Sequence, residues 1–549
     1  MLSYDILIKN GFVVDGAGNP WFRGDVGVRD EKIVNVGHLT SEDAETVIDA
    51  KGLVVSPGFI DVHNHSDASI LINPKVESMV RQGITTLCIG NCGLSAYPVN
   101  ESTKEELHRY LSAFIPVTEI TWRTTRDFLG LIEKQGVACN IAAMVGHGAI
   151  RIAVMGFEAR LPTDSELKEM KSLVAEAMDD GAFGISTGLG YAPGFYSNTE
   201  ELIELSKVVA EKGGIYATHI RSANVTYEEA VAEAIKIGKK AGIPVLINHI
   251  ESHYPDWGET EKILKMINEA RAEGLDVTCD VPPYLYSMSV LTTLLPEWAH
   301  EGGISRMIEQ LKDENFRKKI VKWVKENPSS PAMALAVDGY WEKIKIGSCE
   351  SNPNIVGMSL AEIAEERGVD PYDAVFDLLI EEKRQMIIIY EGHNEEDIRK
   401  VLKHPASMIE SDERARAPYG PLSVGNPHPR AYGTFPMIFR KYVRGETRPD
   451  LLEEKGAKIL TLEEAIRKMT SFPAQRLGIY NRGLIKEGMY ADIVIFDPDE
   501  ISDTATYTDP HKYPVGIKYV IVNGKIILKE RESTDTLAGK VLRGPAYKK

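Results

Sequence analysis

The chain has 549 residues, of which 43% are hydrophobic and 26% are charged, and its formal net charge is −17. This length predicts one large domain and a smaller one. The acidic balance argues against a nucleic-acid partner, and no apolar run reaches the roughly 18 residues of a membrane span. Because no signal peptide is visible and five sparse cysteines form no disulfide framework, we expect a cytoplasmic protein.

Short β-rich runs separated by turn residues occupy both ends of the chain. Asn10-Gly11 and Asp15-Gly16 lie between such runs near the start, and Asn523-Gly524 lies between two runs near the end. Asn-Gly and Asp-Gly in this setting are signals of β-hairpins. We predict a small β-sandwich-like domain that is built from both termini, residues 1–57 and 481–549.

The middle of the chain, residues 58–480, alternates short apolar runs with helical patterns, which is typical of a parallel α/β fold. Eight runs qualify as strands, the number that closes a (β/α)8 TIM barrel. Between the seventh and eighth runs the rhythm breaks, and we predict an insertion over about 286–404 that shapes the barrel mouth. The eight predicted strands are 58–62, 85–89, 138–145, 183–187, 215–219, 244–249, 276–280 and 407–410.

Candidate metal ligands follow these strands. His63 and His65 stand one residue apart at the end of the first strand, and residues i and i+2 of a strand point to the same side. Barrel enzymes keep their active sites at this carboxyl edge, and imidazole, thiolate and carboxylate groups together suit zinc. The remaining candidates at strand ends are Cys92, His219, His249 and Asp412.

The chemistry that follows from such a site is hydrolysis. A bound zinc ion lowers the pKa of its water towards ~7 and polarises a carbonyl group. The carboxylate of Asp412 can take the proton of that water and pass it to a leaving amine. The site therefore predicts hydrolysis of an amide-like bond in a small-molecule substrate.

Several motifs resemble a known family. Residues 57–65, which include His63-Asn64-His65, resemble the opening metal motif of the amidohydrolase superfamily. Segments 90–93 (Gly90-Asn91-Cys92-Gly93), 145–148, 184–194 and 428–436 resemble the D-aminoacylase (N-acyl-D-amino-acid deacylase) branch. The resemblance runs nearly from end to end. It implies zinc-dependent hydrolysis of the amide bond of N-acyl-D-amino acids.

The resemblance also implies which residues bind the metal. In that branch, the cysteine after the second strand stands in for a carboxylated lysine that bridges metals in many relatives. By carry-over, one tight zinc site and a second, weaker site are expected, with Asp412 also acting as the general acid/base. The tight site would consist of Cys92, His219 and His249, and the weaker one of His63, His65 and Asp412.

The substrate pocket is less clearly implied. Tyr191 and Tyr284 match tyrosines of the family's substrate pocket, and Arg430 matches an arginine next to it. His253, in the loop after the sixth strand, is a further candidate for the pocket. His393 is interpreted as a structural or surface residue.

Two features depart from the family pattern, and one of them is that the family's Ser-Asp-Gly at the eighth strand is Ser411-Asp412-Glu413 here. Where the family commonly has a lysine that helps to bind the substrate carboxylate, this chain has Glu251. Since a glutamate repels a carboxylate, we hypothesise that Arg430, Arg414 or Arg416 meets the substrate carboxylate and that Glu251 faces an amine-bearing group, as in a dipeptide. The alternative, that Glu251 only pairs with one of these arginines, stays equally open.

Three other functions also stay open. A dipeptidase or aminopeptidase acting on dipeptides with a D-residue would use the same site. A cyclic amidase of the hydantoinase or dihydroorotase type is disfavoured, because the fourth strand has no lysine. A catalytically silent zinc-binding protein is disfavoured by the complete ligand set. The sequence does not decide the oligomeric state, and a homo-oligomer stays open.

Overall fold

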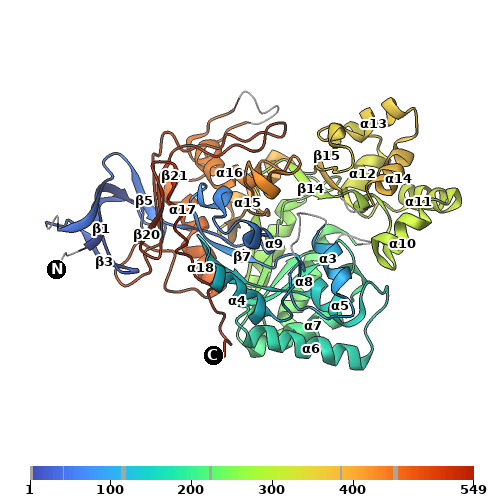
Figure 1. Cartoon of the computed structure of the whole chain (residues 1–549), viewed down its shortest axis with the longest axis horizontal. Helices are drawn as coiled ribbons and strands as arrows, with labels where there is room; N and C mark the ends of the chain where they lie inside the picture. The colour runs from blue at the N-terminus through green and yellow to red at the C-terminus, as the bar shows by residue number, and fades with distance from the viewer. Residues whose placement is uncertain are drawn as a thin grey trace.

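The computed structural model describes residues 4–40, 43–112, 119–221, 225–383, 386–448 and 455–548. The architecture is α/β, with a barrel of parallel strands at the centre. A nine-stranded sheet lies at one end of the molecule, and a helical lobe lies at the other (Figure 1). The functional residues are positioned by the barrel and by the lobe.

The barrel strands lie where the sequence predicts them. The predicted third strand is divided in two by Met144, whose backbone N–H donates to the carbonyl of Ile89 on the neighbouring strand. The ring closes where the last strand meets the first, because Asn64 and Glu413 form a parallel bridge there. The strands, in order around the barrel, are β6 (Phe59–Asp61), β7 (Ile84–Ile89), β8 (Asn140–Ala143), β9 (Val145–Gly146), β10 (Gly184–Gly188), β11 (Ile215–His219), β12 (Val245–Ile247), β13 (Val277–Val281) and β17 (Ser407–Ile409).

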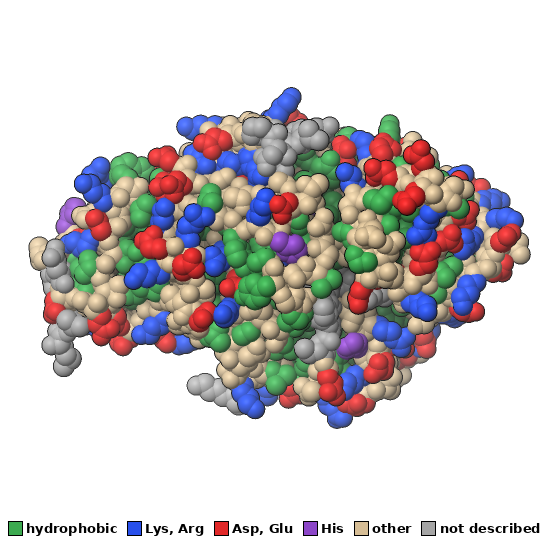
Figure 2. Space-filling model, turned by 45° about the horizontal axis from the view of Figure 1, so that its top comes forward, with side chains coloured by type: hydrophobic (Ala, Val, Ile, Leu, Met, Phe, Trp, Pro, Cys, Tyr) green, Lys and Arg blue, Asp and Glu red, His purple; other side chains and the backbone are tan. Residues whose placement is uncertain are grey.

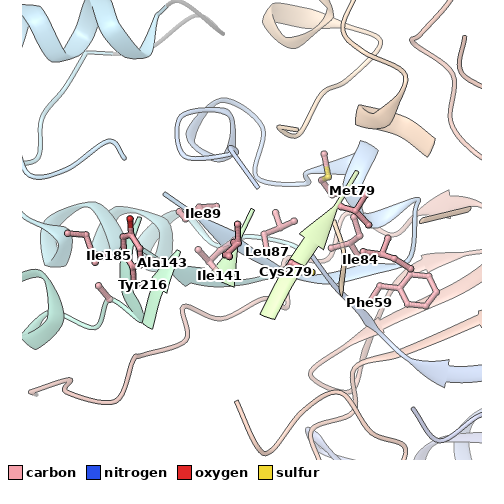
Figure 3. Packing of buried hydrophobic residues seen from close by; sticks show 14 of the residues in the cluster. Phe59, Met79, Ile84, Leu87, Ile89, Ile141, Ala143, Ile185, Tyr216 and Cys279 are labelled. Atoms are coloured by element: carbon pink, nitrogen blue, oxygen red, sulfur yellow. The ribbon is translucent and has the colours of Figure 1, made fainter. Parts of the chain in front are cut away.

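Both faces of the barrel strands are buried, which explains why the strands are continuous apolar runs. Along β7, Leu87 and Ile89 belong to the cluster between the barrel and its outer helices, whereas Cys88 belongs to the cluster inside the barrel. Figure 3 shows Leu87 and Ile89 packed beside Ile141 and Ala143 of β8. The alternation of a strand thus assigns successive side chains to two different cores.

Most of the outer helices begin where the sequence provides a capping side chain. Thr163 and Thr226 each form a capping box with the glutamate three residues later, Glu166 and Glu229, an arrangement that satisfies free backbone N–H groups at a helix start. The helices that cover the barrel include α4 (Thr125–Gln135), α6 (Asp164–Asp179), α7 (Thr199–Glu211), α8 (Tyr227–Ala241), α9 (Thr260–Ala272) and α15 (Glu395–Lys403).

Strands from both ends of the chain share the nine-stranded sheet. The N-terminal and C-terminal parts meet where β5 pairs antiparallel with β18, with Val55 opposite Ile495. In Figure 1, the blue N-terminal strands accordingly lie beside the red C-terminal ones. The strands are β1 (Tyr4–Val13), β2 (Phe22–Arg29), β3 (Lys32–Gly37), β4 (Ala44–Asp49), β5 (Val54–Pro57), β18 (Ile493–Phe496), β19 (Ile517–Val522), β20 (Lys525–Lys529) and β21 (Glu532–Ser533).

The two Asn-Gly pairs behave differently. Asn523-Gly524 forms the predicted hairpin between β19 and β20, and both residues have a positive φ (47° and 73°). The predicted turn at Asn10-Gly11 is wrong, because β1 continues through it with a register shift between Ile8 and Gly11. Asn10 still adopts a positive φ of 63°, so the same backbone preference produces a β-bulge here instead of a hairpin.

A buried polar cluster joins the barrel to the nine-stranded sheet. Arg482 forms an ion pair with Asp492, and both side chains are almost fully buried. The carboxylate of Asp492 also accepts from the side chain of Asn140 on β8 (3.1 Å) and from the backbone N–H of Asn523 (2.8 Å). The contacts of this one carboxylate therefore link the two sheets.

The helical lobe, residues 286–391, lies between β13 and β17 in the chain. It has its own apolar cluster and an antiparallel sheet of order β14-β16-β15. On the face shown in Figure 2, acidic and basic side chains are interspersed, with no large patch of one sign. In the described part of the chain, no helix is both long and apolar enough to cross a membrane. The lobe consists of β14 (Tyr286–Val290), α10 (Gly303–Gln310), α11 (Glu314–Glu326), α12 (Pro331–Val337), β15 (Ile344–Ile346), α13 (Leu360–Arg367), α14 (Pro371–Glu382) and β16 (Ile387–Glu391).

Candidate metal centre and active site

The six expected metal ligands converge at the carboxyl edge of the barrel. They fall into two groups, and within each group the potential ligand atoms lie within 4.8 Å of one another. Cys92 belongs to both groups, so one thiol is shared by the two sets of potential ligands. The groups are His63, His65, Cys92 and Asp412, and Cys92, His219 and His249.

In the first group, Asp412 lies between two imidazoles. Its Oδ1 atom is 3.0 Å from Nε2 of His65 and 3.4 Å from Nε2 of His63. The same nitrogen of His63 is 3.1 Å from Sγ of Cys92. The closing contacts between β6 and β17 bring these side chains together, because the backbone N–H of Asp412 donates to the carbonyl of His63.

The second group is formed by the ends of β11 and β12 together with Cys92. His249 Nε2 lies 2.9 Å from Nδ1 of His219 and 3.8 Å from Sγ of Cys92. Cys92, His249 and Asp412 have a positive φ of 51°, 37° and 44°, a strained conformation for residues other than glycine. Such strain concentrates at functional sites, where the surrounding structure enforces it.

The donor set fits zinc. Burial by itself raises the pKa of the Cys92 thiol, but the neighbouring His63 and hydrogen bonds from His219 and His249 hold this pKa well below its usual value. The group can therefore act as a thiolate, the form that binds metal. Thiolate and imidazole ligands exclude the hard cations Mg²⁺ and Ca²⁺, which take oxygen ligands, and favour zinc.

Asp412 is held as a carboxylate by an arginine. Burial opposes its ionisation, but Arg430 and His65 together keep the pKa of Asp412 well below its ordinary value. A guanidinium nitrogen of Arg430 lies 2.9 Å from Oδ2 of Asp412, on the oxygen that does not face the two histidines. The two oxygens of this carboxylate thus have different partners: Oδ1 faces the two histidines, and Oδ2 faces Arg430.

Two acidic residues behind the metal groups were missed by the sequence reasoning. Asp280 Oδ2 is 3.7 Å from Nδ1 of His63, and its Oδ1 accepts from the backbone N–H of His249 at 2.6 Å. Glu410 is buried, and it joins His63 and Asp280 in a third cluster of potential ligands. Both residues lie at strand ends, the same signal that identified the six ligands. A carboxylate behind a ligating histidine fixes the orientation of its ring.

A cavity of about 260 Å³ opens from the metal groups. Five of the seven residues that were expected to contact substrate line it, namely Tyr191, Glu251, His253, Arg414 and Arg430, whereas Tyr284 and Arg416 are not among the described residues that line it. The cavity continues between apolar side chains of the barrel loops and of the lobe. This volume suits a small molecule whose one end reaches the metal groups.

The two expected pocket tyrosines are placed differently. Tyr191 lines the cavity, and its hydroxyl donates to the backbone carbonyl of Cys92 at 2.7 Å. Tyr284 is buried, with its ring 4.9 Å from the ring of His428. Tyr284 is not one of the described residues that line the cavity.

The lobe supplies cavity residues that no motif indicated. Ser287, Tyr390 and His393, which come from the segments of β14 and β16, line the cavity opposite the barrel loops. The interpretation of His393 as a structural or surface residue was therefore incomplete, since it is buried but faces the cavity. These residues follow no parallel strand of the barrel, so no pattern in the chain indicated that they reach the site.

Comparison with known proteins places this geometry in a family. The amidohydrolase family model matches residues 46–528. The chain belongs to the amidohydrolase family. It is 33% identical over 540 residues to the D-aminoacylase of Alcaligenes xylosoxydans xylosoxydans, and the match covers 98% of this amidohydrolase and 97% of that relative.

Solved structures have the same fold over their full length. The crystal structure of N-acyl-D-glutamate deacylase from Bordetella bronchiseptica, complexed with zinc and a phosphonate inhibitor that mimics the tetrahedral intermediate, is 31% identical and has a TM-score of 0.80. The match covers 98% of this amidohydrolase and 99% of that chain. A D-aminoacylase structure with a binuclear metal centre is 32% identical, with a TM-score of 0.79, and the match covers 98% and 100% of the two chains.

Proposed function

We propose that this amidohydrolase uses zinc to hydrolyse the amide bond of N-acyl-D-amino acids. The observation that carries the proposal is the pair of ligand groups that share Cys92 at the inner end of the cavity, with Asp412 held between two histidines and Arg430. The full-length similarity to N-acyl-D-amino-acid deacylases supports the same substrate class.

The residues divide into a tight site and a weaker one. Cys92, His219 and His249 would hold the tight zinc ion, because a thiolate and imidazoles are the ligands that zinc prefers. The second group, His63, His65 and Asp412, would hold a weaker ion beside it. When bound, zinc supplies Lewis acidity, which acidifies water and polarises a carbonyl group.

Asp412 would act as the general acid and base. Its carboxylate is ionised, so it can accept the proton of the attacking water and then deliver this proton to the leaving amine. Arg430 holds one oxygen of Asp412 and leaves the other facing the histidines. Arg430 and Arg414 also line the cavity, where their charge suits the carboxylate of the amino-acid half of the substrate.

We also propose a division of the chain into three parts. Residues 1–57 and 481–549 would form the small β-domain, and residues 58–480 would form the catalytic barrel. Within the barrel, the segment of about 286–404 would contain an inserted subdomain, the lobe of 286–391, followed by the barrel helix α15. The separate apolar cluster of the lobe and its contribution to the cavity wall support an insertion that shapes the substrate site.

We also propose a cytoplasmic location. All five cysteines are buried and unpaired by disulfides, which suits a reducing compartment. The candidate ligand Cys92 would lose its metal-binding thiolate if it were oxidised to a disulfide.

A rate screen of the zinc-loaded protein tests the proposal. The substrates are matched D and L enantiomers of N-acetyl amino acids, together with a hydantoin. We expect hydrolysis of the D enantiomers at rates at least about 100-fold above those of the L enantiomers, and no opening of the hydantoin ring. Preferred cleavage of L substrates, or ring opening alone, would contradict the proposal.

Two variants test the role of Asp412. Asp412→Asn removes the carboxylate without changing its size, and we expect kcat to fall by at least about 100-fold, because general acid–base catalysis contributes about 10²–10⁴-fold. Asp276→Asn is the matched control, since Asp276 lies at the opposite edge of the barrel, before β13. Full activity of Asp412→Asn would show that another group moves the proton.

A further inference from the structure

Glu251 is a buried carboxylate that faces the cavity. It lies two residues after His249, in the loop that follows β12, and its relative exposure is 0%. Neither carboxylate oxygen has a hydrogen-bond partner in the described part of the chain. It nevertheless lines the same cavity as the metal groups. This carboxylate is thus removed from bulk water and aimed at the space that a substrate would fill.

The basic side chain in contact with Glu251 is a neutral imidazole. Among the described residues, the basic group within 4 Å of its carboxylate is His393, whose Nε2 lies 3.3 Å from Oε1. That nitrogen also lies 2.7 Å from Oγ of Ser287. Burial lowers the pKa of His393 to about 3 and that of the adjacent His253 well below its usual value. Both rings are therefore neutral near pH 7.

The arginines of the cavity pair with other acids. Arg430 lies 2.9 Å from Asp412, and Arg414 lies 3.3 Å from Glu413. The guanidinium groups of the cavity therefore lie beside Asp412 and Glu413, and neither forms an ion pair with Glu251 among the described contacts. A substrate that binds here meets guanidinium groups on one side and a carboxylate on the other.

The free energy of burying such a carboxylate favours a cationic ligand. Burial raises the pKa of Glu251 to about 8, because the ionised form has lost its water and touches no counter-charge. An ammonium group that bound beside it would stabilise the ionised form. A substrate carboxylate would instead add repulsion at Glu251. The amino-acid half of the substrate, which carries the carboxylate, is consequently expected at the arginines, and the acyl half at Glu251.

We propose that Glu251 binds the free ammonium group of an aminoacyl substrate, so that the enzyme prefers dipeptide-like N-aminoacyl-D-amino acids to simple N-acyl-D-amino acids. This inference rests on the proposed function and specifies its acyl group. The reaction remains a hydrolysis. The amide C–N bond breaks, the oxygen of water bonds to the carbonyl carbon, a proton goes to the leaving amine, and two amino acids are released.

The test compares substrates that differ only in the ammonium group. Glycyl-D-amino acids are N-acetyl-D-amino acids with one added amine, and N-acetylglycyl-D-amino acids have that amine capped. For the wild-type enzyme we expect kcat/KM on the glycyl substrate to exceed both others by about tenfold or more, as for a hydrogen bond to a charged group. Equal rates on the three substrates, or faster cleavage of the acetyl substrate, would overturn the proposal.

Variants assign the preference to Glu251. In Glu251→Gln, which keeps the shape of the side chain, the ratio of the glycyl to the acetyl rate should fall to about 1, and in Glu251→Lys it should fall further. The matched control is Asp256→Asn, since Asp256 lies in the same loop after β12 and is exposed, and it is not among the described residues that line the cavity; it should retain the wild-type ratio. A Glu251→Gln enzyme that keeps the wild-type ratio contradicts the assignment.

The three-substrate comparison needs only the wild-type enzyme, so it decides the proposal even where a variant does not fold. It also separates the two levels of inference. If the enzyme cleaves D substrates without regard to the ammonium group, the role of Glu251 fails and the proposed function stands. If it cleaves none of the D substrates but acts on L substrates or on hydantoins, the proposed function itself fails.

Discussion

Cys92 is the residue that connects the two metal groups. Its Sγ is close to ligand atoms of both groups, and its backbone is held in a left-handed conformation by the loop after β7. The backbone carbonyl of the same residue accepts the hydroxyl of Tyr191. Cys92 therefore contributes to both groups of potential ligands and also fixes the hydroxyl of Tyr191 in the cavity wall. A substitution of Cys92 should weaken metal binding more than it destabilises the fold.

Cys92→Ala should lose the tight metal ion. We expect zinc affinity and activity to fall by more than about 100-fold. Removing a residue that only hydrogen-bonds to a metal ligand already lowers metal affinity or activity by about 10–100-fold. Zinc content after dialysis, measured by mass spectrometry, tests this. Cys88→Ala is the control, because Cys88 is equally buried on β7 but belongs to the apolar core. Equal zinc content in both variants would contradict the ligand role of Cys92.

Arg430→Met should change the pH dependence of activity. Arg430 lowers the pKa of Asp412, so its removal raises that pKa, and Asp412 then stays protonated and inactive as a base up to a higher pH. We expect the acid limb of the kcat/KM profile to move to higher pH and the rate at neutral pH to fall by about 10–100-fold. Arg440→Met removes a buried arginine that pairs with Asp503, and its acid limb should stay in place.

At the level of elements, the active site combines a regular scaffold with an irregular wall. The barrel strands place all six proposed metal ligands at one edge, whereas the lobe closes the cavity from the side with residues of β14, β16 and α10. Ligands on rigid strands are held precisely, and a wall built from a separate element can vary without disturbing them. We therefore expect substitutions in the lobe to change the specificity of the enzyme for the size of its substrate.

Met307→Trp tests the lobe wall. Met307 is buried on α10 and lines the cavity, so a larger side chain there should reduce the available volume. We expect KM to rise by about tenfold for substrates with bulky side chains and to change little for the smallest ones, since overpacking costs about 1–3 kcal/mol. Met266→Trp, on the outer helix α9, is the control. A uniform loss on all substrates would indicate misfolding instead.

The sequence predicted the elements that have a simple period. Eight strands were placed closely, because both faces of each strand are buried and each strand is therefore a short apolar run. Within the predicted insertion, the helices α10 and α11 are separated by a turn before Glu314. The positions of His393 and Ser287 depend on how the lobe packs against the barrel, and no local period encodes that contact.

For the stability of the whole molecule, the most important contact is the one between the barrel and the nine-stranded sheet. The cluster of Arg482, Asp492, Asn140 and Asn523 lies at this junction, remote in sequence from the metal ligands. Buried charges of this kind need all their partners, because a lone buried charge is costly. We therefore expect the cluster to affect stability and to leave substrate binding unchanged.

Arg482→Met tests this expectation. The change leaves Asp492 buried without its counter-charge and should lower the free energy of unfolding by about 3–5 kcal/mol, measured from the urea midpoint, with KM unchanged. Lys318→Met removes an exposed lysine that pairs with Glu314, and it should change stability by less than about 0.5 kcal/mol. Equal midpoints for the two variants would contradict the proposed importance of the junction.

The pairing of β5 with β18 also has a consequence for the time course of synthesis. Strand β5 ends at Pro57, and its partner β18 begins at Ile493. A ribosome that adds about 5–20 residues per second needs roughly 20–90 s to make the intervening segment. During that interval the apolar edge of β5 has no partner strand, and an unpaired edge is a template for aggregation. The nascent chain should therefore need the protection of a chaperone most strongly before its last sixty residues emerge.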